Sequence, residues 1–567
     1  MKKIEERGDM RVRGKMTYAY EKVRQCRKLN TLWLSAEEVT LTTVLSSRIP
    51  VRNRKRLNMF FIFYLFTFSL VALLFLLWKV KKGGVEEKEL SKLNLNGPHN
   101  HFLGEYLNIL ELRDKTKTIK SLQKWSKIYG PIFQLNFGPF RFILLNSPNY
   151  VQKLLSSSEQ AHLSKSFVYN ACKPFWFDGL IISKGDKWKS RRKLLNHIVT
   201  FKSLHSYMQI YNRESLSLVN KLDQHFSIDI SKPKPIEVLL MTSSLNVIME
   251  AAMGADISKM TSIGDKSFVQ CVNTCMSIVV TRILNPWLMV EWIWKLHPMS
   301  KYGMEEIARG KEYVRQTMKN NKEKKMEESS ENEEKRSKSL IEDLQQAGLT
   351  EEEITGEVFT VISAGYETTA TTIHLLLFLL SLHPAEQERC RQEIDNVFED
   401  QELCPGGNLN SAALGKLKHL EKCIQETLRF YPVVPVFQRQ IEAKLELEPG
   451  LVLPSNTIVT IFPQGMHMNP EYFPEPQKFK PERFCIEEVK ARHPFVYIPF
   501  AAGPRMCLGY KFAMMEILIL TSRILRHFVV SSNDSWDNLV FLPNITLKPE
   551  TPINFRFQKR KLLNNNN

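Results

Sequence analysis

One cysteine of this chain has neighbours that favour its thiolate form. Cys507 lies in the Gly/Pro-rich stretch Phe500-Ala-Ala-Gly503-Pro504-Arg505-Met506-Cys507-Leu508-Gly509, and a helix-like run follows at residues 510–527. The thiolate is the metal-binding form of cysteine, and free backbone N–H groups at a helix N-terminus stabilise it. Glycines let the backbone approach a bulky planar group. The pattern predicts a cysteine that ligates haem iron, with an inert buried cysteine as the alternative.

A second group of polar residues interrupts an otherwise apolar helical run. The stretch Ala364-Gly365-Tyr366-Glu367-Thr368-Thr369 places a glycine, an acid and two threonines in the interior of a helix. Threonine hydroxyls can bond back to main-chain carbonyls and open a local kink. On its own this pattern indicates either such a kink or a close crossing of two helices at small residues.

Together these motifs resemble the cytochrome P450 haem-thiolate monooxygenases, whose signature is Phe-x-x-Gly-x-Arg-x-Cys-x-Gly. The residues that match it are Phe500, Gly503, Arg505, Cys507 and Gly509. Ala501 departs from stricter forms of the pattern, which have Ser, Gly, Asn or His at that position.

The resemblance extends over residues 97–557. Within the family, the chain most resembles the family 4 branch and looks like an arthropod-like microsomal member of it. Segments that carry it are His162-Leu-Ser-Lys165-Ser-Phe167, residues 179–188, residues 470–476 and Arg492-His-Pro494. The fold that it implies is mainly α with a small β-rich part, preceded by a single N-terminal transmembrane helix.

The resemblance also implies roles for individual residues. Cys507 would be the iron ligand, while Glu367 and Thr368 would relay protons to dioxygen. The other residues expected to bind the cofactor are Trp188, Arg192, Arg439, Phe500 and Arg505. Glu426 and Arg429 form an ExxR pair, and the resemblance implies that this pair joins Arg483 in a buried structural network. The alternative is an ordinary ion pair on the surface of a helix, which would contribute little to stability.

The implied cofactor is haem b. Ala364 stands where much of the family 4 branch has a glutamate that forms an ester with a haem methyl, so we expect haem that is not covalently linked. The implied reaction inserts one oxygen atom of O2 into a C–H bond of a lipophilic substrate, such as a fatty acid, hydrocarbon, hormone or xenobiotic. A haem-thiolate isomerase or dehydratase and a non-catalytic haem- or lipid-binding relic are the alternatives.

Electrons would come from NADPH through the FAD and FMN of a cytochrome P450 reductase, with cytochrome b5 as an optional second donor. Basic residues near the Cys507 loop could steer an acidic partner of this kind. The residues concerned are Lys187, Lys189, Arg191, Lys193 and Lys511.

Several secondary-structure elements must position these residues. Thr350-Glu-Glu-Glu353 is a capping box that predicts a long helix ending at His383, and Pro384 then opens another helix over 385–398. An amphipathic helix is expected at 417–430. Strands are expected at 444–447, 451–453 and 457–462, separated by Pro-Gly and Pro-Ser turns.

The almost wholly apolar residues 57–78 are long enough to span a bilayer and predict a membrane anchor. Residues 1–56 hold 15 Lys/Arg and six Asp/Glu and would form a basic N-terminal extension. A chain that starts at Met59 would keep basic residues only after the anchor, which places the large domain in the cytosol on the endoplasmic reticulum membrane. A mitochondrial presequence is disfavoured by the acids in the extension.

Composition narrows the remaining possibilities. The net charge of +18 is half contained in residues 1–56, so it gives little support to nucleic-acid binding. The nine cysteines form no CxxC pair, which argues against a zinc knuckle or a disulfide framework. We expect a linker at residues 79–96, one haem-thiolate domain at 97–557 and a disordered tail at 558–567.

Overall fold

The structure is a computed structural model that describes residues 85–98, 108, 111–112, 114–137, 140–227, 232–254, 268–327 and 339–561. The expected anchor at 57–78, the extension at 1–56 and Met59 lie outside these ranges. Within the described ranges, no single helix combines the length and apolar composition needed to cross a bilayer. The helices α18 (Glu351–Leu382) and α19 (Pro384–Glu399) meet that criterion only together, across a bend of 115°.

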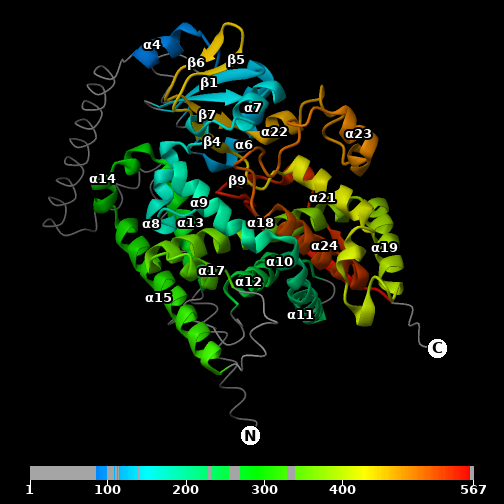
Figure 1. The fold of residues 1–567 in the computed structure, drawn as a ribbon. Coiled ribbons are helices and arrows are strands. Elements are labelled where there is room, and N and C mark those ends of the chain that lie inside the picture. Colours follow the sequence, from blue (N-terminus) through cyan, green and yellow to red (C-terminus); the bar gives the residue numbers. More distant parts are fainter. Residues whose placement is uncertain are drawn as a thin grey trace, which may run out of the picture. The chain divides into compact units, whose positions relative to one another are not determined.

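Helices make up most of the described chain (Figure 1). They are α4 (Val85–Lys92), α6 (Lys115–Tyr129), α7 (Pro148–Leu155), α8 (Lys173–Trp176), α9 (Gly185–Leu195), α10 (Phe201–Ser206), α11 (Met208–Ser227), α12 (Glu237–Met253), α13 (Phe268–Leu284), α14 (Glu291–Leu296), α15 (Pro298–Glu327), α17 (Leu340–Gln346), α18 (Glu351–Leu382), α19 (Pro384–Glu399), α20 (Ser411–Leu414), α21 (Lys418–Phe430), α22 (Pro463–His467), α23 (Ile486–Ala491) and α24 (Tyr510–His527). The expectation of a mainly helical fold is confirmed.

The strands form small sheets. They are β1 (Ile132–Phe137), β2 (Phe140–Leu145), β3 (Lys234–Pro235), β4 (Phe437–Gln440), β5 (Leu445–Glu448), β6 (Leu451–Leu453), β7 (Ile458–Ile461), β8 (Phe528–Ser532), β9 (Phe541–Pro543), β10 (Leu547–Pro549) and β11 (Asn554–Lys559). The largest sheet has the order β1-β2-β7-β4 and is antiparallel except for the parallel pair β2 and β7. The expected strands near 444–462 are β5, β6 and β7.

The long helix α18 crosses the middle of the helical body (Figure 1). It begins as the capping box predicts, because the side chain of Thr350 accepts from the N–H of Glu353 and the Glu353 side chain accepts in return from Thr350. It ends at Leu382, where α19 starts with Pro384 at its first turn. Its residues 375–380 are completely buried, and α12, α21 and α24 pack against it. The predicted boundaries of α18, α19 and α21 are confirmed to within one residue or two.

Both ends of the described chain are more ordered than we expected. The expected linker contains α4, whose Leu90 is buried in a hydrophobic cluster that also includes apolar residues of β5 and β7. At the other end β11 runs through Gln558 and Lys559, and Arg560 forms an ion pair with Asp395 at 2.6 Å. Strand pairing and this ion pair hold residues 558–560, the first residues of the expected tail, against the fold.

Candidate functional site

The Cys507 loop is closed on itself before α24 begins. The N–H of Cys507 donates to the carbonyl of Phe500 at 2.9 Å, and the Phe500 ring packs edge-on against Tyr510 with centroids 4.8 Å apart. Gly503 has φ +71, and a Cβ there would lie 1.7 Å from the carbonyl oxygen of Leu155 in α7. Only glycine fits at this position, because both the conformation and the contact with α7 exclude a side chain.

The one departure from the loop signature has a structural meaning. Ala501 has φ +56, in the left-handed region that L-residues avoid. Glycine and asparagine tolerate this conformation better than alanine does. The preference for residues such as Gly and Asn at this position therefore reflects a backbone that needs a positive φ. In this chain a strained alanine adopts that conformation.

Cys507 is an exposed residue in the described chain, unlike the mostly buried other cysteines. The protein nevertheless surrounds its sulfur closely enough that desolvation raises the pKa of the thiol, while the N–H of Gly509 and the charge of Arg192 lower that pKa. A metal cation that binds the sulfur lowers the pKa of such a thiol further, so that the thiol becomes a thiolate.

Cationic side chains gather beside this loop. The Arg505 guanidinium donates to the carbonyls of Ser183 at 2.6 Å and Leu180 at 3.4 Å, and it lies 4.3 Å from the centre of the Trp188 ring. Arg192 of α9 donates to the carbonyl of Met506 at 2.9 Å. The structure thus brings three of the predicted cofactor-binding residues, Trp188, Arg192 and Arg505, together on one side of the Cys507 loop.

Two more cations complete this cluster. Arg439 of β4 is 2% exposed, and Lys165 lies with its ammonium 4.7 Å from the centre of the Tyr169 ring. Burial and the charges of Arg439 and Arg505 hold the pKa of Lys165 well below its usual value. Burial, followed by the charge of Arg439, lowers the pKa of Arg505 to about 9.

These four cations, Lys165, Arg192, Arg439 and Arg505, form no ion pair with a carboxylate among the described residues. The Nε of Arg505 is buried without a hydrogen-bond partner. Desolvated like charges are costly unless an anion accompanies them. The two propionate groups of haem are anions of this kind, so the residues present fit the cofactor that the Cys507 loop implies.

The polar stretch of α18 presents a partly open face. Val361, Ala364, Gly365 and Thr368 are exposed or half-exposed, whereas Glu367 and the other residues of this stretch are buried. Their spacing of i, i+3, i+4 and i+7 puts them on one side of the helix. The Thr368 hydroxyl donates to the carbonyl of Ala364 at 2.7 Å, as expected, yet α18 continues through the stretch without a break.

Glu367 and Thr368 are not hydrogen-bonded to each other in this structure. The Glu367 carboxylate instead forms an ion pair of 2.6 Å with the ammonium of Lys548 in β10. The two predicted proton-handling residues therefore lie next to each other in sequence but have separate partners.

The ExxR pair is part of a buried network, as expected. The guanidinium of Arg429 donates to both oxygens of Glu426, at 2.7 and 2.9 Å, and both side chains are completely buried. Arg483 forms the third member, with its Nε 3.4 Å from the same carboxylate. His467 links this network to the segment before the Cys507 loop, because its carbonyl accepts from Arg429 and its Nε2 accepts from the N–H of Ile498.

One residue of the expected partner-docking surface is wrongly assigned. Arg191 is buried, and its guanidinium pairs with Glu353 and with Glu357 at 3.6 Å. On α9 it faces α18, since a side chain one position before Arg192 points to a different side of the helix. Lys187, Lys189 and Lys193 are exposed on the same helix, as is Lys511 on α24.

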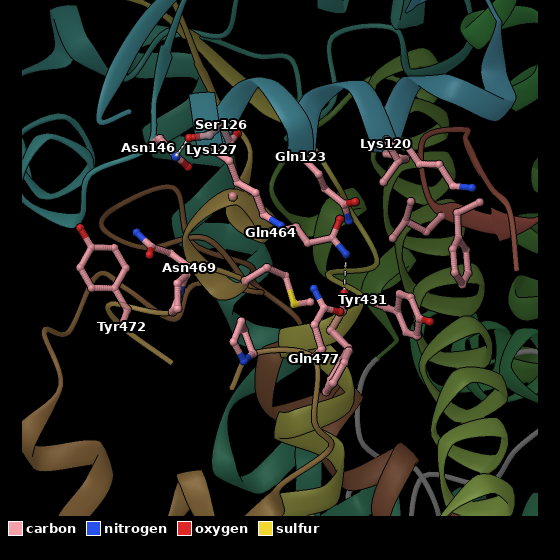
Figure 2. A pocket seen from close by; sticks show the side chains of 18 of the residues that line it. Lys120, Gln123, Ser126, Lys127, Asn146, Tyr431, Gln464, Asn469, Tyr472 and Gln477 are labelled. Atoms are coloured by element: carbon pink, nitrogen blue, oxygen red, sulfur yellow. Dashed lines mark hydrogen bonds between the residues drawn. The ribbon is translucent and has the colours of Figure 1, made fainter. Parts of the chain in front are cut away.

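A cavity of about 960 Å³ lies away from the Cys507 loop, between α6, the end of α21 and residues 463–477 (Figure 2). Its lining includes Lys120, Gln123, Tyr431 and Gln464, and it includes none of the predicted catalytic or cofactor-binding residues. This cavity is therefore separate from the site at Cys507.

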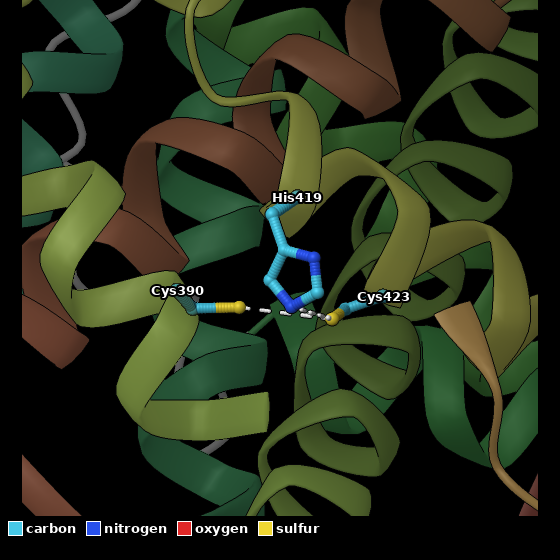
Figure 3. A group of neighbouring side chains, drawn as sticks. All are labelled: Cys390, His419 and Cys423. Carbon is cyan, nitrogen blue, oxygen red and sulfur yellow. Dashed lines mark hydrogen bonds between the residues drawn. The ribbon is translucent and has the colours of Figure 1, made fainter. Parts of the chain in front are cut away.

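A buried sulfur pair lies between α19 and α21 (Figure 3). The sulfurs of Cys390 and Cys423 are 3.6 Å apart, and the Cys423 sulfur is 3.7 Å from Nε2 of His419. That nitrogen also lies 2.9 Å from a carboxylate oxygen of Glu386. Burial raises the pKa of Cys423 well above its ordinary value, so we interpret the pair as packed thiols; all cysteines in the described ranges are free.

Three residues of the site were not found by sequence reasoning: Lys165, His467 and Lys548. Lys165 belongs to a segment that carries the resemblance, but nothing in the sequence indicates that its neighbours in space are Arg439 and Arg505. His467 and Lys548 have no motif of their own. Their contacts join elements that are distant in sequence, so only the folded chain reveals them.

Comparison with known proteins agrees with this site. The family model described as Cytochrome P450 matches residues 97–557. The chain is 33% identical to cytochrome P450 4V2 of Homo sapiens over 449 residues, which cover 76% of this chain and 82% of the relative. It is 31% identical to cytochrome P450 4d2 of Drosophila melanogaster over 484 residues, which cover 82% of this chain and 92% of the relative. With its Cys507 loop, its cation cluster and these similarities, the chain belongs to family 4 of the cytochromes P450 and is a haem monooxygenase.

Proposed function

We propose that this protein inserts one oxygen atom of O2 into a C–H bond of a lipophilic substrate, while the other oxygen atom leaves as water. The observation that carries the proposal is the exposed Cys507 beside four cations that no described carboxylate neutralises. This arrangement suits a planar cofactor with one metal and two anionic groups.

The roles of individual residues follow from their positions. Cys507 would hold the iron, and Trp188, Arg192, Arg439 and Arg505 would hold the propionates, with Lys165 as an added cation. Phe500 would shape the loop through its carbonyl and its ring contact with Tyr510. When bound, haem supplies oxygen activation, and a thiolate ligand adds electron density that favours cleavage of the O–O bond.

Protons would be handled on the open face of α18. Thr368 lies half-exposed there, and buried Glu367 is the adjacent acid. With haem bound, a hydroxyl group and an adjacent carboxyl group on this face of the helix would hold and move protons by general acid–base chemistry. Thr368 would position and donate the proton, and Glu367 would replace it.

The haem would be held without an ester bond. Ala364 is an exposed residue on the same face of α18 as Thr368, and its methyl group offers no carboxylate for such a bond. Acid extraction should release all of the haem from the denatured polypeptide, whereas haem that stays on the chain would contradict this part of the proposal.

The electrons would come from NADPH through the FAD and FMN of a cytochrome P450 reductase, with cytochrome b5 as a second donor. The exposed Lys187, Lys189 and Lys193 of α9 and Lys511 of α24 support this, since α9 also carries Arg192 beside the Cys507 loop. We place the enzyme on the endoplasmic reticulum membrane, anchored by residues 57–78, with residues 97–557 in the cytosol.

The test is NADPH consumption measured together with product formation, using full-length protein with the reductase in lipid vesicles and a panel of fatty acids, hydrocarbons and steroid-like hormones. We expect reductase-dependent hydroxylation of at least one class. Conversion of a hydroperoxide without reductase would instead indicate an isomerase or dehydratase. Ligand binding without turnover under either condition would indicate a relic.

A further inference from the structure

The packed thiols of Cys390 and Cys423 belong to a larger group of side chains that can bind metals, between α19 and α21 (Figure 3). The two sulfurs are 3.6 Å apart, and Nε2 of His419 lies 3.7 Å from the Cys423 sulfur. A carboxylate oxygen of Glu386 lies 2.9 Å from the same nitrogen. A carboxylate oxygen, an imidazole nitrogen and two sulfurs thus follow one another at contact distance.

The two helices supply these side chains in matched pairs. Glu386 and Cys390 are four residues apart on α19, and His419 and Cys423 are four residues apart on α21. Side chains at i and i+4 lie on the same face of a helix, one turn apart. The two pairs meet because α19 packs against α21, and such an arrangement needs no CxxC spacing in the sequence.

Hydrogen bonds to the main chain fix how the two helices meet. The carboxylate of Glu393 on α19 accepts from the backbone N–H groups of His419 at 2.8 Å and Leu420 at 3.1 Å. These N–H groups belong to the first turn of α21, where the helix itself offers them no acceptor. Because Glu393 is one turn from Cys390, the first turn of α21 is held beside the buried sulfurs.

The spacing of the donor atoms suits a tetrahedral ion. Zinc binds cysteine sulfur at about 2.3 Å and histidine nitrogen at about 2.0–2.1 Å, so neighbouring ligand atoms of a tetrahedral site lie about 3.5–3.8 Å apart. The sulfur–sulfur distance of 3.6 Å and the sulfur–nitrogen distance of 3.7 Å fall in this range. Sulfur and imidazole ligands favour zinc over magnesium or calcium, which prefer oxygen.

The group extends from the surface to the core. Cys390 and Cys423 are completely buried, and His419 is 8% exposed. The side chain of Glu386 is 20% exposed and that of Glu482 is 50% exposed, and both carboxylates have an oxygen within 4.8 Å of a His419 nitrogen. A cation can therefore approach the imidazole from solvent past two acidic groups.

We propose that Cys390, His419 and Cys423 bind one zinc ion, with Glu386 as the fourth ligand, and that the ion fastens α19 to α21. On binding, each thiol releases one proton to solvent and its sulfur bonds to the ion, while Nε2 of His419 and one Glu386 oxygen donate lone pairs. Zinc stays divalent, and no electrons are transferred. Glu386 must turn toward the ion and loosen its contact of 3.1 Å with Arg389.

Such an ion would be structural, because four protein ligands leave no open position for a substrate. It would stabilise α21, the helix that also carries Glu426 and Arg429 of the ExxR network. The proposed site shares no residue with the Cys507 loop or the cation cluster. It therefore does not depend on the proposed monooxygenase function.

Two other interpretations fit the same contacts. The thiols can pack as small apolar groups while Nε2–H of His419 donates to Glu386. The sulfurs can also form a disulfide, since a bond of about 2.05 Å needs only a modest approach from their present separation. The readouts must therefore separate a bound ion, free thiols and an oxidised pair.

The variants are Cys390→Ser and Cys423→Ser, each of which replaces one sulfur by a hydroxyl group. Cys404→Ser is the matched control, since Cys404 is also a buried cysteine, 1% exposed, but does not belong to the group. All are made in the full-length haem-loaded protein, expressed with added zinc and purified under reducing conditions.

The first readout is the zinc content per chain, with X-ray absorption at the zinc edge to identify the ligands. Wild type and Cys404→Ser should hold one zinc, with two sulfur neighbours at about 2.3 Å and two lighter neighbours at about 2.0–2.1 Å. Cys390→Ser and Cys423→Ser should bind zinc at least about tenfold more weakly. A wild type without zinc, zinc that lacks sulfur neighbours, or equal binding by the serine variants would overturn the proposal.

The second readout is the thermal midpoint before and after a chelator removes the zinc. Removal should lower the midpoint of wild type and Cys404→Ser, and added zinc should restore it, because a ligand that binds only the folded chain stabilises it. The midpoints of Cys390→Ser and Cys423→Ser should not respond. A wild-type midpoint that ignores the chelator would show that the ion does not fasten the helices.

Alkylation of the unfolded wild-type chain, followed by mass spectrometry, identifies the alternatives. Two alkylated cysteines in a chain that never bound zinc would show packed thiols, and two cysteines that resist alkylation until reduced would show a disulfide. Either result overturns the proposal. If a serine variant does not fold, the ligands that X-ray absorption finds in the wild type still decide whether the site exists.

Discussion

The N–H of Cys507 and the carbonyl of Phe500 form a hydrogen bond of 2.9 Å that closes the loop between them. Inside that loop Gly503 lies against the backbone of α7, at the Leu155 carbonyl, so that no side chain can be added. The backbone of the loop that carries Cys507 is therefore fixed by this hydrogen bond and by the contact with α7.

The strained Ala501 can be relieved. Ala501→Gly should raise the free energy of unfolding by about 0.5–1 kcal/mol. An alanine in the left-handed region costs ~1–2 kcal/mol, and glycine removes this cost. Part of the stabilisation is offset because glycine also increases the conformational entropy of the unfolded chain. Ala502→Gly is the control, since Ala502 is not among the residues with positive φ and should lose ~0.5–1 kcal/mol. Thermal unfolding of the haem-loaded protein measures both. Destabilisation by Ala501→Gly would contradict the assigned conformation.

The cation cluster should set how tightly haem is held. Lys165→Met should speed the transfer of haem to apomyoglobin by at least about tenfold, because it removes one charge-assisted contact worth ~1.5–3 kcal/mol. Lys153→Met on the surface of α7 should leave the transfer rate unchanged. Equal rates in the two variants would show that Lys165 faces something other than the propionates.

The ExxR network should be indispensable for the folded state. Glu426→Ala leaves Arg429 and Arg483 without their shared carboxylate in a fully buried position, at a cost of roughly 3–5 kcal/mol. We expect a large fall in the thermal midpoint and poor haem incorporation. Glu487→Ala, at an exposed position of α23, should behave as the wild type. A stable, fully haem-loaded Glu426→Ala protein would show that the network is dispensable.

A buried acid in α24 should make stability depend on pH. Desolvation raises the pKa of Glu516 to about 8, while the Ser244 hydroxyl donates to it at 2.6 Å. The pKa of Glu516 in the unfolded chain is near 4.5, so between pH 4.5 and 8 the folded chain holds one proton that the unfolded chain has lost. The free energy of unfolding therefore falls as the pH rises through that window.

Glu516→Gln removes this charge while nearly keeping the shape of the side chain. The variant should unfold at the same temperature as the wild type near pH 4.5 and at a clearly higher temperature near pH 8.5. At about pH 8.5 its free energy of unfolding should exceed that of the wild type by an amount on the order of several kcal/mol. Parallel pH profiles of the two proteins would mean that Glu516 is ionised in the fold.

Local signals in the sequence were sufficient for much of the fold. The Thr350 capping box and Pro384 mark the start of α18 and the start of α19, since both act through bonds within a few residues. The Cys507 loop was predictable for the same reason, because its glycines, arginine and cysteine are contiguous.

Contacts between distant segments were not predictable. Lys548 meets Glu367 only because β10 is folded back on α18, and Lys165 meets Arg439 only because residues before α8 pack near β4. Arg191 was wrongly expected on the surface because charged residues surround it in sequence, and its partners Glu353 and Glu357 lie on α18. The sign of φ at Ala501 also has no signal in an alanine.

The most direct test of the account is the carbon-monoxide difference spectrum of the dithionite-reduced full-length protein, with Cys507→Ser alongside. We predict a strongly red-shifted Soret band that the variant loses, which would establish that Cys507 ligates the iron through its thiolate. A band at the position typical of histidine-ligated haem in the wild type, or an unchanged band in Cys507→Ser, would contradict it.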